Sequence, residues 1–164
     1  MSGTDVRWYA VVDTAQDERL LGLVQGCREH QCLVGGTLEP ELAATLPWLV
    51  AFDPAEPLAR AWRGEGTGKG WGILLTSDLP FASLRTHLKK FQNARLPDGR
   101  LVWFRFFDPA VLQALFRSSS PEEQAPWFKG VERYVIEADD QPGHYHVRFA
   151  DGQLSAEMIA PVAA

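Results

Sequence analysis

Short apolar runs alternate with helix-like segments along the first two thirds of the chain, and this order leaves few folds open. The runs are rich in Val, Leu and aromatic residues and are typical of strands. We expect strands near 7–12, 31–34, 48–52, 71–76 and 101–107, and helices over 18–29, 40–46, 57–63, 80–94 and 109–117. Such alternation predicts an α/β fold, with a mixed β-sheet of five or more strands flanked by helices.

The pattern changes near residue 131. Segment 131–138 is strand-like, 139–143 is typical of a loop, and apolar and polar residues then alternate from 145 to 149. Asp151-Gly152 follows, a dipeptide that favours a two-residue hairpin turn. Residues 154–160 include several helix formers, but the alternation continues through Leu154, Ala156 and Met158 and predicts a C-terminal antiparallel β-hairpin.

The 164 residues fit one domain, 1–164, because no repeat and no long linker divides them. The net charge of −5 argues against a chain built to coat nucleic acid or an anionic membrane. The apolar runs are far shorter than the roughly 20 residues of a membrane helix. The start of the chain does not resemble an export signal, so we expect a cytoplasmic protein.

Familiar ligand-binding motifs are incomplete. The glycine-rich segment 63–70 lacks the spacing of a phosphate loop and leads from a helix into a strand, so it is interpreted as a connection. Cys27, His30 and Cys32 lack a matching second half for zinc. His144 and His146 share one strand face without an evident third ligand. No metal or other cofactor is therefore expected.

Three expected strands end in an aspartate: Asp13, Asp53 and Asp108. A carboxylate at this position can cap the helix that follows, and this is the favoured interpretation. The alternative is an acidic cluster at the carboxyl ends of parallel strands, which would suit a small metal-dependent hydrolase. Arg105 lies in the most aromatic strand, so we expect it to pair with one of these aspartates.

The chain holds 6 Trp, 3 Tyr and 9 Phe, more large rings than a small core needs. Those in expected strands or on the 80–94 helix are assigned to the core: Trp8, Trp48, Trp71, Trp103, Phe104, Phe106, Phe81 and Phe91. Those outside the strongest core patterns are candidates for exposed anchors at a protein interface: Trp62, Trp127, Phe128 and Tyr145.

A series of short segments, taken in order, resembles the type VI secretion adaptor family, whose members are also called effector chaperones. The segments are 8–13 (WYAVVD), 32–36 (CLVGG), 46–50 (LPWLV), 71–77 (WGILLTS), 84–91 (LxxHLxxF), 96–99 (LPDG), 104–109 (FRFFDP) and 127–131 (WFKGV). The resemblance covers a core of 8–131 and leaves a short C-terminal extension, 132–164.

The resemblance implies a non-catalytic protein in the cytoplasm of a Gram-negative bacterium. Members of this family bind a toxic effector and help to load it onto the C-terminal region of a VgrG-type spike protein, so no small-molecule substrate is expected. Many members carry a longer helical C-terminal lobe, and here the hairpin could replace it by offering an edge strand. An immunity protein that neutralises a toxin is a further alternative.

Two groups of residues are the partner-binding candidates, besides Trp127 and Phe128. One is the basic face of the 80–94 helix, at Arg85, Lys89 and Lys90. The other is the hairpin, at Tyr145, His146 and Arg148. Asp13, Asp53, Arg105 and Asp108 are assigned structural roles.

Overall fold

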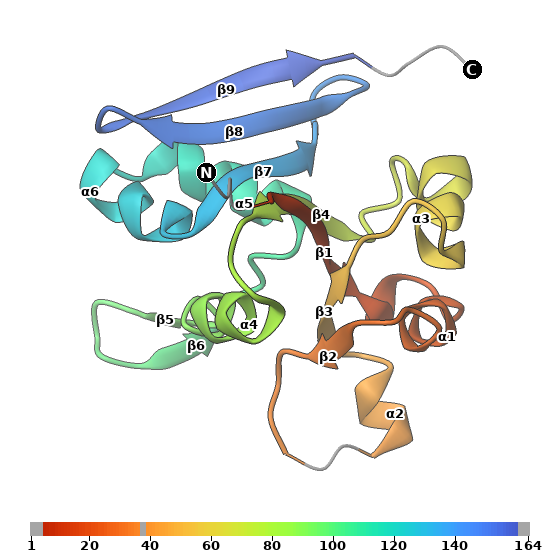
Figure 1. Cartoon of the computed structure of the whole chain (residues 1–164). Helices are drawn as coiled ribbons and strands as arrows, with labels where there is room; N and C mark the ends of the chain where they lie inside the picture. Colours follow the sequence, from red (N-terminus) through yellow and green to blue (C-terminus); the bar gives the residue numbers. More distant parts are fainter. Residues whose placement is uncertain (1–4, 37–38, 161–164) are drawn as a thin grey trace.

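The computed structural model describes residues 5–36 and 39–160 and contains a seven-stranded sheet in the order β2-β3-β1-β4-β7-β8-β9 (Figure 1). Its strands are β1 (Arg7–Asp13), β2 (His30–Cys32), β3 (Pro47–Ala51), β4 (Gly72–Ser77), β7 (Val131–Glu137), β8 (His144–Ala150) and β9 (Gln153–Ile159). A separate two-stranded sheet pairs β5 (Asn93–Arg95) with β6 (Leu101–Trp103). The helices are α1 (Leu20–Gln25), α2 (Pro40–Ala43), α3 (Pro57–Ala61), α4 (Phe81–Lys89), α5 (Pro109–Ser118) and α6 (Pro121–Gln124).

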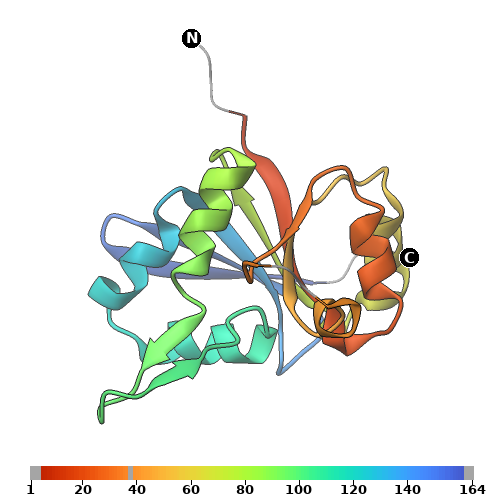
Figure 2. The same cartoon turned by 90° about the horizontal axis from the view of Figure 1, so that it is seen from below.

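The large sheet separates two apolar cores, and the strands at its centre are buried on both faces. Along β1, Tyr9 and Val11 point into one core, whereas Ala10 and Val12 point into the other. The first core is covered by α4 and α5, and the second by α1, α2 and α3 (Figure 2). Burial on both faces explains why the central strands are continuous apolar runs rather than alternating ones.

The expected α/β class is confirmed, with a sheet of more than five strands, flanking helices and a C-terminal hairpin. Every strand pair in the described part of the chain is antiparallel, whereas a mixed sheet was expected. The cause is the order of the sheet, because β3 and β4 both pair with β1 and run opposite to it. Helical segments between successive strands therefore do not imply parallel neighbours here.

The expected strand over 101–107 is the main error in the element assignment. Only Leu101–Trp103 is a strand, and it belongs to the small sheet. Phe106 and Phe107 are buried beneath the large sheet without pairing to it. The expected 80–94 helix also ends early, at Lys89, because residues 93–95 form β5. The apolar segment 104–107 therefore supplies side chains to the core without forming a strand.

The C-terminal hairpin is formed as expected, and its return strand β9 pairs with β8 over seven successive residues. Asp151 and Gly152 have φ angles of 54° and 73° and form the two-residue turn. Positive φ at both positions is the conformation that makes Asp-Gly a strong hairpin signal. Together with β7, the hairpin extends the sheet outward from β4.

Several aromatic residues are exposed where we expected them to be buried, or buried where we expected them to be exposed. Trp48, Trp71 and Phe106 are buried as expected, but Trp8 is 40% exposed and Trp103 is 46% exposed. Conversely, Trp62 and Trp127 are only 4% and 6% exposed, so they are not surface anchors. The 101–107 error explains Trp103, because its strand lies outside the large sheet.

Candidate interaction surface

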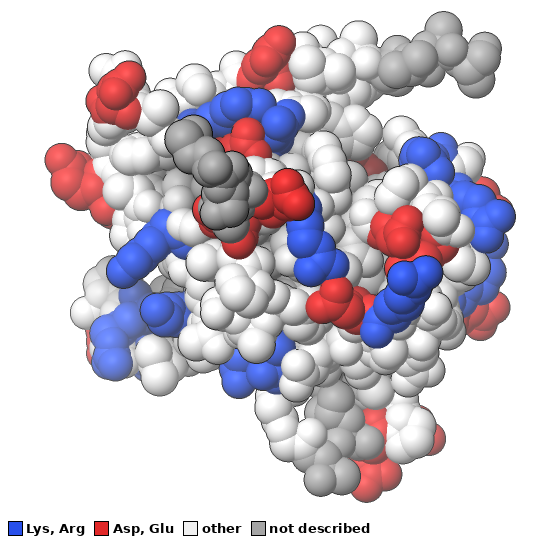
Figure 3. All heavy atoms as spheres, in the orientation of Figure 1, with Lys and Arg blue, Asp and Glu red and all other residues white. Residues whose placement is uncertain are grey.

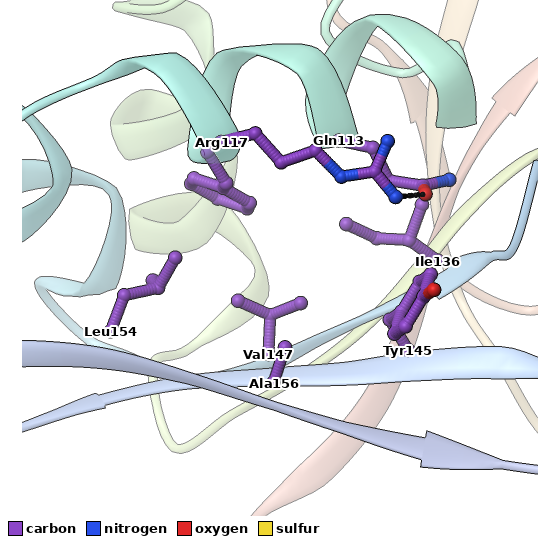
Figure 4. Close-up of a pocket in the computed structure, with 8 residues that line it drawn as sticks. Gln113, Arg117, Ile136, Tyr145, Val147, Leu154 and Ala156 are labelled. Atoms are coloured by element: carbon purple, nitrogen blue, oxygen red, sulfur yellow. Dashed lines mark hydrogen bonds between the residues drawn. The ribbon is translucent and has the colours of Figure 1, made fainter.

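A groove lies between α5 and the β8–β9 hairpin, on the face of the sheet that α5 covers (Figure 4). Its volume is about 300 Å³, enough for one or two large side chains of another molecule. The residues that line it are Gln113, Phe116, Arg117, Ile136, Tyr145, Val147, Leu154 and Ala156. We call this site the α5–hairpin groove. Most of its lining is apolar, with polar groups confined to α5 and to Tyr145.

Local sequence explains how the groove forms. Asp108 caps α5 by accepting a hydrogen bond from the Ala110 amide, and Pro109 occupies the first turn. Helical spacing then aims Gln113 and Phe116 at the sheet. On the hairpin, strand alternation places Val147 and Ala156 opposite each other on the same face, and Figure 4 shows both pointing toward α5.

The rim of the α5–hairpin groove carries one cation. The Arg117 guanidinium lies 5.9 Å from the centre of the Tyr145 ring and donates a hydrogen bond to Gln113 Oε1 at 3.1 Å. A weaker ion pair joins Arg117 to Asp139 at 3.4 Å, and the Arg117 side chain is about half exposed. The Tyr145 hydroxyl donates to Asp140. Arg117 is therefore free enough to meet a carboxylate on an incoming chain.

His146 and Arg148 lie on the other face of the sheet from Tyr145, because neighbouring strand residues alternate. Arg148 approaches Glu132 at 3.7 Å, and His146 Nδ1 lies 3.3 Å from Arg133. The three candidate hairpin residues therefore do not form one surface. His144 and His146 do share a face, as expected from their spacing. Among the residues the structure describes, however, no group of three or more His, Cys, Asp or Glu is placed to hold a metal ion.

Helix α4 lies on a different side of the molecule from the β8–β9 hairpin (Figure 1). Arg85 is partly buried and donates a hydrogen bond to the Cys32 carbonyl at 2.9 Å, so it joins α4 to β2. Lys89 is also partly buried, and of these three residues only Lys90 is exposed. The face shown in Figure 3 carries charges of both signs in a mixed arrangement. The basic helix face is thus smaller than the sequence indicated.

His87 lies on the buried side of α4, with its ring 5.1 Å from that of Phe91. Burial lowers the pKa of His87, with help from Lys90 and Lys129, against an opposing contact with the Trp127 carbonyl. The unfolded chain therefore binds more protons below about pH 6.5. We expect the free energy of unfolding to fall as the pH is lowered from 7 to 5. Urea titrations of the wild type and of His87→Gln should show a shallower pH dependence in the variant, and equal slopes would contradict this assignment.

The remaining aromatic candidates pack against other aromatic rings of this protein. Trp127 stacks on Phe91 at 3.9 Å between ring centres and lies inside the α4–α5 core. Phe128 is partly exposed and packs beside Phe149 at 5.8 Å. Of the four candidate anchors, only Phe128 and Tyr145 have accessible rings, and Tyr145 is the one that lines the α5–hairpin groove.

The three strand-end aspartates do not form an acidic cluster. Asp13 ends β1 opposite Pro47, at the start of the antiparallel strand β3, whereas Asp53 follows the far end of β3. Each caps a turn or helix instead: the Ala15, Ala55 and Ala110 amides donate to Asp13, Asp53 and Asp108, respectively. The alternative of an acidic centre at parallel strand ends is therefore wrong for this sheet.

Arg105 pairs with Asp13, which confirms the expected partnership between this arginine and a strand-end aspartate. Arg105 Nη2 lies 2.5 Å from Asp13 Oδ2, and Gln16 Nε2 donates to the same oxygen at 2.9 Å. Asp13 is 2% exposed, and its carboxylate is satisfied by the Arg105, Gln16 and Ala15 donors. The arginine itself is about half exposed, contrary to the buried position expected in a strand.

The two cysteines are buried and reduced. Burial raises the pKa of Cys27 to about 11, and it also raises the pKa of Cys32. His30 Nδ1 contacts the Cys27 carbonyl at 2.9 Å rather than a thiol. Neutral, buried thiols are poor nucleophiles and poor metal ligands, so these residues serve as small apolar side chains in the second core.

Most residues of the α5–hairpin groove were missed in the sequence. Tyr145 was a candidate, but the others from α5, β7 and β9 were not: Gln113, Phe116, Arg117, Ile136, Val147, Leu154 and Ala156. The amphipathic spacing of 109–117 and the hairpin alternation show which side chains share a face. Neither pattern shows that these two faces lie across from each other with space between them.

The chain is therefore an α/β protein with an apolar groove that has Arg117 at its rim. In residues 5–36 and 39–160, no helix is long and apolar enough to span a membrane. The chain belongs to the family described as "Domain of unknown function (DUF4123)", whose sequence model matches residues 8–126. No curated protein and no solved structure matches the chain. The family match ends before β7, so β7, β8 and β9 lie beyond it.

Proposed function

We propose that this chain is a type VI secretion adaptor that acts in the bacterial cytoplasm. It binds a toxic effector and helps to load that effector onto the C-terminal region of a VgrG-type spike. The observation that carries this proposal is the family match over 8–126. The strand and loop motifs of the resemblance fall within this range, apart from the closing segment 127–131.

The α5–hairpin groove is the proposed effector site. It joins α5, which lies inside the family segment, to β8 and β9, which lie beyond it. Its apolar lining provides the contact area that dominates affinity at protein interfaces, and Arg117 adds a charge that selects a partner. An effector segment with a large apolar side chain beside a carboxylate has the chemistry to occupy it.

The other candidates are proposed as secondary contacts. These candidates are not among the residues that line the α5–hairpin groove: Lys89 and Lys90 at the end of α4, and His146 and Arg148 on the opposite face of the hairpin. Exposed charges of this kind mainly raise association rates. Their separation from the groove suits a protein that holds two partners at once.

Co-purification from the native host tests the proposed function. The tagged chain should retain both a spike protein and a toxin. Co-expression with that toxin should stabilise the toxin without abolishing its activity. Abolished toxicity would instead identify an immunity protein, and retention of neither partner would contradict the proposal.

Arg117→Glu tests the groove itself. The Arg117 side chain is exposed enough for the variant to fold, and reversing its charge should weaken effector binding roughly 10-fold. Arg60→Glu, an exposed charge reversal on α3, is the matched control and should leave the affinity unchanged. Titration calorimetry with the purified effector measures both. Equal affinities for the two variants would place the effector elsewhere while leaving the adaptor function standing.

A further inference from the structure

Within the part of the chain that the structure describes, the outer edge of β9 has little of the protection that is usual at a sheet edge. Among the described residues, no strand pairs with this edge, and Figure 1 shows β9 as the outermost strand of its sheet. The strand is seven residues long, contains no proline, and pairs with β8 without a bulge. Its single charged residue is Glu157. Strands of this kind pair readily with another strand.

We propose that β9 pairs antiparallel with β9 of a second copy of this chain, forming a two-fold symmetric dimer with one continuous sheet. This inference goes beyond the adaptor function and does not rest on it. The occupant of the edge is a second copy, rather than the effector strand expected from sequence, because β9 is complementary to itself.

The hairpin turn determines which backbone groups of β9 face outward. A two-residue turn makes its flanking residues, Ala150 and Gln153, a hydrogen-bonded pair. Hydrogen-bonded and non-bonded pairs then alternate along the ladder. The N–H and C=O groups of Leu154, Ala156 and Met158 therefore point away from β8. These are the groups available to a second strand.

One register uses all of these groups. With Ala156 opposite Ala156 of the other copy, Leu154 lies opposite Met158, and every outward-facing residue gains a hydrogen-bonded partner. Leu154 and Met158 are partly exposed on the groove side of the hairpin, so this register places apolar side chains together. Displacing the strands by two residues would leave outward groups unpaired.

Charge favours the same register. Glu157 lies opposite Ser155 of the other copy, and Ser155 in turn lies opposite Arg148 on β8. Because the Ser155 side chain is short, the Glu157 carboxylate of one copy can face the Arg148 side chain of the other copy, which is half exposed. Centring the pair on Glu157 instead would place two carboxylates directly opposite each other, which is destabilising.

The dimer also joins the two α5–hairpin grooves. Leu154 and Ala156 form part of each groove and belong to the pairing strand, so each groove reaches the edge. The two-fold axis stands perpendicular to the sheet and keeps both grooves on the same face. The result is one longer apolar trough with an Arg117 on each side.

Sedimentation velocity of the full-length chain tests the pairing. We expect the dimer fraction to rise with concentration over roughly 1–100 µM, the range for a small interface. Ala156→Pro should weaken the dimer at least about 20-fold, because proline removes an outward donor at the centre. That donor does not bond to β8, so circular dichroism should show the fold retained. A monomer throughout this range, or an unaffected dimer in a folded variant, would overturn the proposal.

Cross-linking provides a test that does not depend on the proline variant. The introduced cysteines of Ala156→Cys should lie about 5.5 Å apart between their Cα atoms and react with a short bismaleimide to give a covalent dimer. Gln153→Cys is the matched control on the same strand, with its two copies about 20 Å apart. The native Cys27 and Cys32 are buried and should not react. Equal cross-linking of both variants, or of neither, would refute the register.

Discussion

Replacing Trp127 by alanine is expected to lower the free energy of unfolding by about 3–5 kcal/mol. The ring stacks on Phe91 at 3.9 Å, and its edge contacts include Phe106 and Phe116 at 5.6 and 6.0 Å between ring centres. Alanine would leave a large cavity where α4 and α5 meet the sheet, because these rings cannot all move in to fill it. Urea denaturation followed by circular dichroism measures the change.

Trp103→Ala is the matched control, since it removes the same side chain from an exposed position on β6. The expected loss is below about 1 kcal/mol. Comparable losses for the two variants would mean that Trp127 is not the centre of this core. A stable Trp127→Ala protein that fails to bind its partners would restore the interpretation of Trp127 as an interface anchor.

Replacing Asp13 by alanine is expected to lower the free energy of unfolding by about 2–3 kcal/mol. The carboxylate accepts hydrogen bonds from the Ala15 amide, Gln16 Nε2 and Arg105 Nη2. Removing it abolishes the cap and leaves the buried position of Asp13 without its carboxylate. Because Ala15, Gln16 and Arg105 are exposed, their donors can regain water, so we assign most of the loss to the missing cap and the emptied buried position.

Asp108→Ala is the comparison for Asp13, because it removes a less buried cap at the start of α5. Its expected effect is about 1 kcal/mol. Thermal and urea unfolding of both variants, measured in parallel, give the difference. A fully stable Asp13→Ala protein would show that Asp13 is not structural. If the wild type also had a metal-dependent phosphoesterase activity that this variant lacked, the hydrolase alternative would be supported.

Local patterns predicted the parts of the fold that depend on neighbours in sequence. The central strands were located because residues buried on both faces leave a continuous apolar run, as in 48–52. The Asp151-Gly152 turn fixed the hairpin, since its positive φ angles suit few other residues. Asp108 followed by Pro109 marked the start of α5 for a similarly local reason.

Errors arose where long-range packing decides the outcome. Phe106 and Phe107 have the composition of a strand, but they fill the core from a turn between β6 and α5. Trp127 lacked any periodic pattern because it lies in a short 3-10 turn, and its burial depends on rings distant in sequence. Sheet order was likewise not encoded in the alternation of strands and helices.

The candidate site shows the same division. Tyr145 was found because the hairpin alternation shows which residues share its face. The groove opposite it requires α5 to pack across the sheet without filling the space above β9, and no local pattern reports an unfilled space. His146 and Arg148 were grouped with Tyr145 by proximity in sequence, although the pleat separates them onto the other face.

The central position of β1 has a consequence for how the chain folds during synthesis. Its neighbours β3 and β4 end at residues 51 and 77, so β1, which is synthesised before both, must wait for distant segments. By contrast, β7 pairs with β8 and β8 pairs with β9, so these successive strands close quickly. We therefore expect the slow step of folding to be the assembly of β2, β3, β1 and β4. Until β4 has been synthesised, one edge of the apolar strand β1 is unpaired. We expect this edge to be the part of the nascent chain that most readily associates with a wrong partner.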